Sequence, residues 1–138
     1  MPVHFDIRPV VEKHSELPVA RLRVLNRFED VELKNIRRGI VFVFAAWSGT
    51  AILALQRLTG LVAQLKTSAI EFVVLDIDCL TADSATLLFG NTGFIAGGNG
   101  ETIWVMDGAI IAREVAVSAN EQLLIEHTKK LLDEFADP

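Results

Sequence analysis

The stretch Phe44-Ala45-Ala46-Trp47-Ser48-Gly49-Thr50-Ala51 decides the fold of this chain, because it joins a strand pattern to a helix pattern. The residues from Ile40 to Ala45 are all apolar and rich in β-formers, which predicts a central strand buried on both faces. Ser48 is a residue type that caps helices, and leucines at helical spacing follow it to about Lys66. The stretch therefore predicts a buried strand that leads directly into a long amphipathic helix.

The rest of the chain completes a sheet. The remaining predicted elements are a core strand over Ile70–Asp78, a short helix from Thr81 or Asp83 to Phe89, strands over Thr102–Met106 and Ala109–Val115, and a final helix from Ser118 or Asn120 to Phe135. A strand-helix-strand crossover makes the first two core strands parallel, and the Asp107-Gly108 hairpin signal makes the last two antiparallel. The order predicts an α/β fold in which helices flank a mixed β-sheet.

The N-terminal 38 residues have weaker patterns. Residues 1–18 predict an arm with one short strand or helical turn, whereas Val19–Leu25 alternates apolar and basic residues like a half-buried strand. Residues 26–38 fit either a turn plus a strand or an irregular helix, and the pattern does not separate the two. A length of 138 residues with 51% hydrophobic residues is typical of one domain with a single core.

Positive charge is concentrated at the start of the chain, whose net charge is −5. Residues 1–38 hold 8 Lys or Arg against 6 Asp or Glu, while the remainder holds 5 against 12. Arg21 and Arg23 are two positions apart, so their side chains would lie on the same face of a strand. That face is either a solvated surface or a patch for an acidic partner. Because the chain is acidic as a whole and no nucleic-acid-binding motif appears, we expect no nucleic-acid partner.

The single cysteine, Cys79, excludes an intramolecular disulfide, which fits a reducing cytoplasm. The start of the chain, Met1–Asp6, lacks a signal-peptide pattern, and the longest apolar run, Ile40–Trp47, is too short to span a membrane. We therefore expect a cytoplasmic location and no membrane contact.

Three segments of the chain resemble the thioredoxin-like superfamily, and they arrive in that family's order over about residues 39–135. Trp47-Ser48-Gly49-Thr50-Ala51 is similar to the redox loop, Val74–Asp78 to the Val-Asp-Val-Asp strand, and Glu101–Gly108 to the Pro-Thr-leading strand with its hairpin. The resemblance implies a thioredoxin-like core over residues 39–138. Residues 1–38 are then an N-terminal arm with extra strand, part of the same domain.

Besides a longer Gly90–Gly100 loop, three differences from the family pattern concern its chemistry. Ser48 and Ala51 stand where the two redox cysteines would be, and a hydroxyl has no reversible disulfide chemistry. Glu101 takes the place of the family's cis-proline. A cis bond before a non-proline residue costs about 2.5–4 kcal/mol, so we expect a trans peptide and a reshaped groove. The family's buried carboxylate is also absent from its strand, which carries Phe42 and Phe44.

Other candidate sites have simpler structural explanations. Ser48 as a nucleophile needs a base, and His4, His14 and His127 lie in no recognised motif, so we interpret Ser48 as a helix cap. Cys79 is interpreted as a half-buried small residue whose thiolate the neighbouring acids disfavour. Three carboxylates, Asp76, Asp78 and Asp83, are too few for a cation site, so the sequence predicts no metal, no cofactor and no catalytic residue.

The glycine-rich segment from Gly90 to Gly100 is the remaining candidate. It lacks a phosphate-binding motif but carries Phe94 and Ile95, two large apolar residues among five glycines. These two side chains either fold onto the core or contact a partner, and we expect the segment to be mobile and a contact surface.

The leading interpretation is a non-redox thioredoxin-fold protein that binds an unidentified protein. Accessory, chaperone-like, inhibitor and immunity-type roles all fit that description. One alternative is a redox or other enzyme that uses Cys79 or an unrecognised site. Another is a structural homo-oligomer, such as a homodimer. The candidate binding residues are Phe94, Ile95, Arg21 and Arg23, and the positions of the degenerate motif are Trp47, Ser48, Gly49, Thr50, Ala51 and Glu101.

Overall fold

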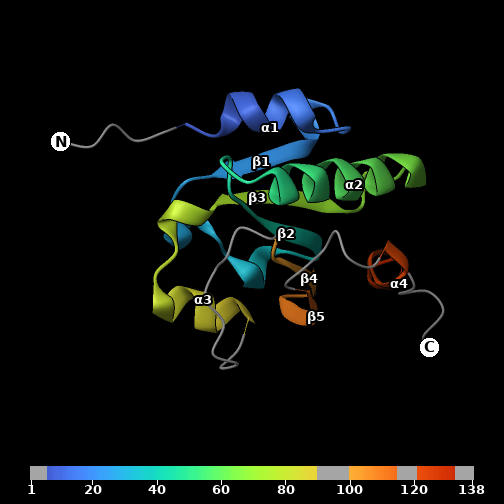
Figure 1. Ribbon diagram of the computed structural model, residues 1–138. Coiled ribbons are helices and arrows are strands. Elements are labelled where there is room, and N and C mark those ends of the chain that lie inside the picture. The colour runs from blue at the N-terminus through green and yellow to red at the C-terminus, as the bar shows by residue number, and fades with distance from the viewer. Residues whose placement is uncertain (1–5, 90–99, 115–120, 133–138) are drawn as a thin grey trace.

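A computed structural model describes residues 6–89, 100–114 and 121–132, which form a five-stranded mixed sheet in the order β1-β3-β2-β4-β5 (Figure 1). The strands are β1 (Leu22–Leu25), β2 (Arg38–Phe44), β3 (Glu71–Asp76), β4 (Thr102–Met106) and β5 (Ala109–Glu114). Parallel pairing joins β1 to β3 and β3 to β2, and antiparallel pairing joins β2 to β4 and β4 to β5. The mixed α/β sheet predicted from the sequence is confirmed.

The central strand β2 is buried on both sides, as its continuous apolar run predicts. Its residues alternate between the faces, so Ile40, Phe42 and Phe44 point one way and Val41 and Val43 the other, and all five are 0% exposed. The first of these faces packs against the long helix α2 (Gly49–Leu65), which follows directly after β2.

Two more helices lie on the same face as α2. Helix α4 (Glu121–Lys130) contacts α2, and its Thr128 hydroxyl accepts a hydrogen bond from the buried Trp104 indole at 3.1 Å. Helix α1 (Arg8–His14) packs on the outside of α2, where the Glu16 amide donates to Thr59 Oγ1 at 2.9 Å. The helical alternative for residues 1–18 is therefore the one observed (Figure 1).

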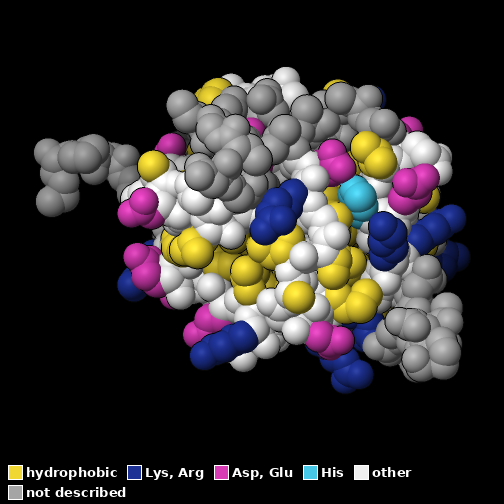
Figure 2. Space-filling model, turned by 90° about the horizontal axis from the view of Figure 1, so that it is seen from below, with side chains coloured by type: hydrophobic (Ala, Val, Ile, Leu, Met, Phe, Trp, Pro, Cys, Tyr) yellow, Lys and Arg dark blue, Asp and Glu magenta, His cyan; other side chains and the backbone are white. Residues whose placement is uncertain are grey.

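The opposite face has a thinner cover. Helix α3 (Ala82–Phe89) lies there, since Arg113, on the Ile103 side of the sheet, donates from Nε to the Leu88 carbonyl at 2.8 Å. Beside α3, the chain from β1 to β2 makes two 3-10 turns, η2 (Phe28–Asp30) and η3 (Leu33–Asn35). Seen from below the view of Figure 1, toward the β5 edge of the sheet, apolar side chains gather on the side of the molecule where α3 and β5 lie (Figure 2).

Two of the predicted strands are shorter than the sequence indicated. Val19–Arg21 forms a 3-10 turn, η1, so the strand begins at Leu22 and Arg21 lies outside it. The predicted second core strand ends at Asp76, because its carboxylate accepts the Asp78 amide at 3.0 Å and turns the chain into η4 (Ile77–Cys79). A strand over Ile70–Asp78 would have put Asp76 and Asp78 on one face, and the turn after Asp76 shows that this part of the prediction is wrong.

Local signals were more accurate. Thr81 is the N-cap of α3, one of the two residues predicted for that role. Its hydroxyl oxygen accepts the Ser84 amide hydrogen, and its own amide donates to the Ser84 hydroxyl oxygen. The Asp107-Gly108 hairpin forms with positive φ angles of 51° and 81°, the left-handed geometry that such a pair supplies.

Candidate functional site

The degenerate motif lies at the carboxyl end of β2, between the last strand residue and the start of α2. The chain turns there, with the Ser48 amide donating to the Ala45 carbonyl at 3.0 Å. The turn holds Trp47 at the surface, where the residue is 69% exposed, the highest exposure among the large apolar residues that the structure describes. The site is thus a helix start flanked by an exposed indole.

Ser48 is the N-cap of α2, as predicted. Its hydroxyl oxygen accepts the Ala51 amide hydrogen at 3.2 Å, which satisfies one of the amides that a helix start leaves without an intrahelical partner. Ala51 is 0% exposed. The two described histidines bond elsewhere, His14 near Gln56 at 3.3 Å and His127 to Glu114 at 2.8 Å. No described residue therefore supplies Ser48 with a histidine base.

Glu101, which the resemblance places where the family has its cis-proline, has a trans peptide bond, since the described residues contain no cis peptide. Its carbonyl accepts the Val43 amide at 2.8 Å, so the backbone extends the pairing between β2 and β4. The Glu101 residue is 0% exposed. The predicted trans bond is confirmed, and the position is filled by a buried acid.

Asp76 is the second buried acid at this end of the sheet, with 2% exposure. It pairs with Phe44 across the β2–β3 ladder, whereas Glu101 bonds Val43 on the other side of β2. The two carboxylates therefore flank the end of β2 on opposite faces of the sheet. The sequence pattern did not predict this burial, because the family's buried carboxylate was expected within β2, where Phe42 and Phe44 stand. The available signal was an acid directly after a fully apolar run, as Asp76 is after Phe72–Leu75.

A hollow of about 300 Å³ lies beside Trp47 at this end of the molecule. Ile7, Ala46 and Ile77 supply its apolar wall, and Asp76 and Asp78 its polar one. The exposed indole and this hollow together form what we call the Trp47 face. Its mixture of one large aromatic, apolar walls and acids suits a protein segment better than a small polar molecule.

Cys79 is half-buried in η4, as predicted. Burial, followed by the charges of Asp76 and Glu29, raises the pKa of its thiol to about 11. Only about one thiol in ten thousand is then ionised at neutral pH, and the thiolate is the reactive form. The position is unsuited to nucleophilic or disulfide-exchange chemistry.

The other predicted binding residues lie elsewhere. Phe94 and Ile95 are outside the described residues, so the contact surface expected over residues 90–100 stays a prediction. Arg21 and Arg23 lie on the β1 side of the sheet, far from Trp47 in the topology, and they bond different groups. Arg21 donates to the Ile70 carbonyl at 3.0 Å, while Arg23 pairs with Glu71 at 3.2 Å.

The chain has a thioredoxin-like fold, and with one cysteine it cannot carry a Cys-x-x-Cys motif. Solved structures with this fold include mitochondrial thioredoxin 3 from Saccharomyces cerevisiae, at 16% identity and a TM-score of 0.60, covering 80% of this chain and 96% of the other. A Fasciola hepatica thioredoxin is 21% identical, with a TM-score of 0.58 and coverage of 78% and 97%.

Thioredoxin from Trypanosoma brucei brucei matches with a TM-score of 0.60 at 10% identity, over 82% of this chain and 92% of that one. Neither a protein-family model nor a curated protein sequence matches the chain. At these identities the likeness establishes the fold alone. Within the described segments, no helix combines the length and apolar character needed to cross a membrane.

Proposed function

We propose that this chain is a non-redox thioredoxin-fold protein that binds another protein through the Trp47 face. The observation that carries the proposal is the 69% exposure of Trp47 beside a hollow with an apolar wall. Tryptophan is among the residues most enriched at binding hot spots, and here it stands beside a hollow with apolar walls into which a partner side chain could fit.

The absence of redox chemistry is the second part of the proposal. Dithiol exchange needs one thiolate to attack and a second thiol to resolve the mixed disulfide. Ser48 and Ala51 supply neither, and the raised pKa of Cys79 keeps the remaining thiol protonated. These facts count against the alternative of an enzyme that uses Cys79. A cytoplasmic accessory, chaperone-like, inhibitor or immunity-type factor is the class of role that fits.

A photo-crosslinking experiment tests the proposal. The photoreactive amino acid benzoylphenylalanine replaces Trp47 in one variant and Leu87 in a matched control, because Leu87 is 68% exposed on α3, on the opposite face of the sheet. Irradiation in the source cells is expected to give a discrete crosslinked species from position 47 and none at the same mass from position 87. Mass spectrometry then identifies the partner, and light scattering shows whether it is a second copy of this chain.

A Trp47→Ala variant provides the reverse test. It is expected to fold normally, because the side chain is exposed, and to lose the partner captured by the wild type. Equal capture by both proteins would remove Trp47 from the binding surface.

A further inference from the structure

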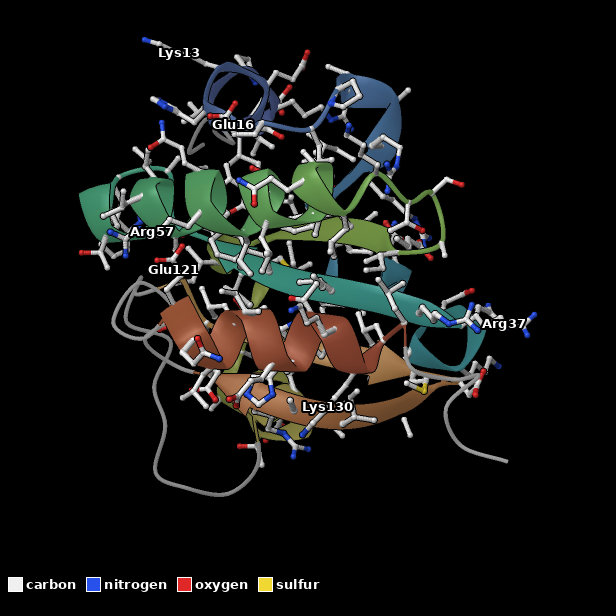
Figure 3. The ribbon with its side chains drawn as sticks, turned by 90° about the vertical axis from the view of Figure 1, so that its right-hand side faces the viewer. Lys13, Glu16, Arg37, Arg57, Glu121 and Lys130 are labelled. Atoms are coloured by element: carbon white, nitrogen blue, oxygen red, sulfur yellow. The ribbon has the colours of Figure 1, made fainter. Side chains whose placement is uncertain are left out.

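The charged side chains that line the hollow of the Trp47 face are all acidic. Asp76 and Asp78 belong to the lining, and no Lys, Arg or His is among the described residues that form it. Elsewhere the two signs are mixed, as Figure 3 shows over α1, α2 and α4 with the bases Lys13 and Arg57 and the acids Glu16 and Glu121. The hollow is therefore a place where charge selects the segment that binds.

Asp78 is the acid of the hollow that a partner can reach. The residue is exposed, whereas Asp76 is buried and accepts the Asp78 amide at 3.0 Å. The Asp78 carboxylate itself makes no hydrogen bond or ion pair with the residues that the structure describes. A cation from a partner would therefore pair with Asp78 without breaking an internal bond of that carboxylate.

The thiol next to Asp78 responds to the same negative charge. Burial is the first cause that raises the pKa of Cys79, and the side-chain charges that raise it further are those of Asp76, Glu29 and Asp78. All three are carboxylates, and carboxylate charges disfavour a thiolate in the way that they favour a cation. The electrostatic field around η4 is therefore negative, including any internal partner that an acid has.

A cation on an apolar stem fits this hollow better than a metal ion does. The described residues contain no group of three or more His, Cys, Asp or Glu side chains that could hold a metal. The rest of the lining is apolar, since Ile7, Ala46 and Ile77 form one wall. Lysine and arginine combine an aliphatic stem with a charged end, so the stem contacts an apolar wall while the charge meets a carboxylate.

The exposed indole of Trp47 favours the same kind of side chain. A Lys or Arg cation over the face of an aromatic ring is attracted to it, and tryptophan is the best ring for this contact. The planar guanidinium of arginine also stacks on a ring and pairs with a carboxylate through two N–H groups. Because Trp47 and Asp78 line one hollow, a base that enters it meets both.

We infer that the Trp47 face binds a protein segment in which a lysine or arginine stands next to an aliphatic residue. The base contacts the Trp47 indole and the Asp78 carboxylate, and the aliphatic side chain packs on the apolar wall of the hollow. This inference rests on the proposed function, because it names the chemistry of the segment that the same face binds.

Peptide display tests the composition of the segment. Random heptapeptides on phage are selected on the wild-type chain and, in parallel, on Trp47→Ala. The peptides captured by the wild type alone are expected to carry Lys or Arg next to Leu, Ile or Val more often than the unselected library does. Peptides that depend on Trp47 but lack this excess would overturn the inference and leave the proposed function standing. Equal capture of all peptides by both chains would overturn both.

Fluorescence anisotropy with one selected peptide, labelled at its end, tests the contact with Asp78. Binding is expected to weaken as ionic strength rises, and Asp78→Asn is expected to weaken it about two- to fivefold, the loss typical of an exposed ion pair. Asp83→Asn, the same charge change at an exposed position of α3 outside the hollow, is the matched control and is expected to change binding little.

A charge exchange gives a gain that misfolding cannot imitate. When the base of the selected peptide is replaced by glutamate, Asp78→Lys is expected to bind that peptide more tightly than the wild type does. Equal affinity of wild type and folded Asp78→Asn for the original peptide, together with no gain in the exchange, would overturn the pairing with Asp78.

Discussion

The Ser48 hydroxyl oxygen lies 3.2 Å from the Ala51 amide nitrogen and accepts its hydrogen bond at the start of α2. These are the two positions at which the resemblance to thioredoxins would place sulfur atoms. One side chain is therefore a helix cap, and the other is a fully buried methyl group. A helix cap and a core contact therefore occupy the two positions at which the resemblance places thiols.

Restoring both cysteines is expected to create a disulfide. The N-cap and the third helical residue lie about one turn apart, within the Cα separation that a disulfide spans. In a Cys79→Ala background, Ser48→Cys with Ala51→Cys should lose two hydrogens in mass under mild oxidation and react with no thiol reagent until reduced. The Ser48→Cys single variant is the control. A folded double variant that stays reduced would mean that the two side chains do not face each other.

Removing the cap alone is expected to cost stability. Ser48→Ala leaves a helix amide without its side-chain acceptor, which lowers the free energy of unfolding by about 1 kcal/mol. Ser48→Asp restores an acceptor and should recover most of that loss. Urea denaturation measures both, with Thr50→Ala, an exposed change in the same turn, as the control. A loss in Ser48→Asp as large as in Ser48→Ala would contradict the capping role.

Cys79 is expected to react slowly and the whole chain to fail in an insulin-reduction assay with dithiothreitol. A pKa of about 11 against an ordinary value of 9.0 leaves about a hundredfold less thiolate at pH 8. Alkylation by iodoacetamide should therefore keep accelerating about tenfold per pH unit beyond pH 9. The urea-unfolded chain is the control and should level off near pH 9.

The raised pKa of Cys79 also makes the free energy of unfolding depend on pH. The unfolded chain loses its thiol proton first, so the contribution of Cys79 is complete below about pH 9 and is lost as pH rises toward 11. Rapid alkylation of the folded chain at pH 7, or insulin reduction that disappears in Cys79→Ala, would contradict this account.

Gly100, beside the buried Glu101, is expected to tolerate no side chain. Its φ is +79°, and an added Cβ would lie 2.6 Å from the Cβ of Ala54 in α2. Backbone strain and the clash together should lower the free energy of unfolding by about 2–4 kcal/mol in Gly100→Ala. Gly49→Ala is the matched control, since nothing lies within 4 Å of its added Cβ, and it should be neutral or stabilising by up to about 1 kcal/mol. Similar denaturation midpoints for the two variants would show that the Gly100 backbone can relax.

The features predicted correctly from the sequence are those that depend on neighbours within a few residues. Ser48 caps α2 through an amide three residues away, and Asp107-Gly108 turns through its own backbone angles. The apolar run of β2 specifies a buried central strand because no exposed strand tolerates it. These local signals, together with crossover and hairpin rules, were sufficient for the mixed sheet and the thioredoxin-like order of its elements.

Tertiary structure decided the rest, because it depends on partners far along the chain. Strand β3 ends where Asp76 turns the chain, and β1 starts where its pairing with β3 begins. The spacing of apolar residues in the sequence predicts neither position. Burial of Glu101 follows from its place opposite Val43, 58 positions away, and the bond from Arg21 to the Ile70 carbonyl follows from the pairing of β1 with β3. The sequence by itself determined a thioredoxin-like sheet that lacks redox thiols; which acids are buried, and which groups Arg21 and Arg23 bond, depended on packing between distant segments.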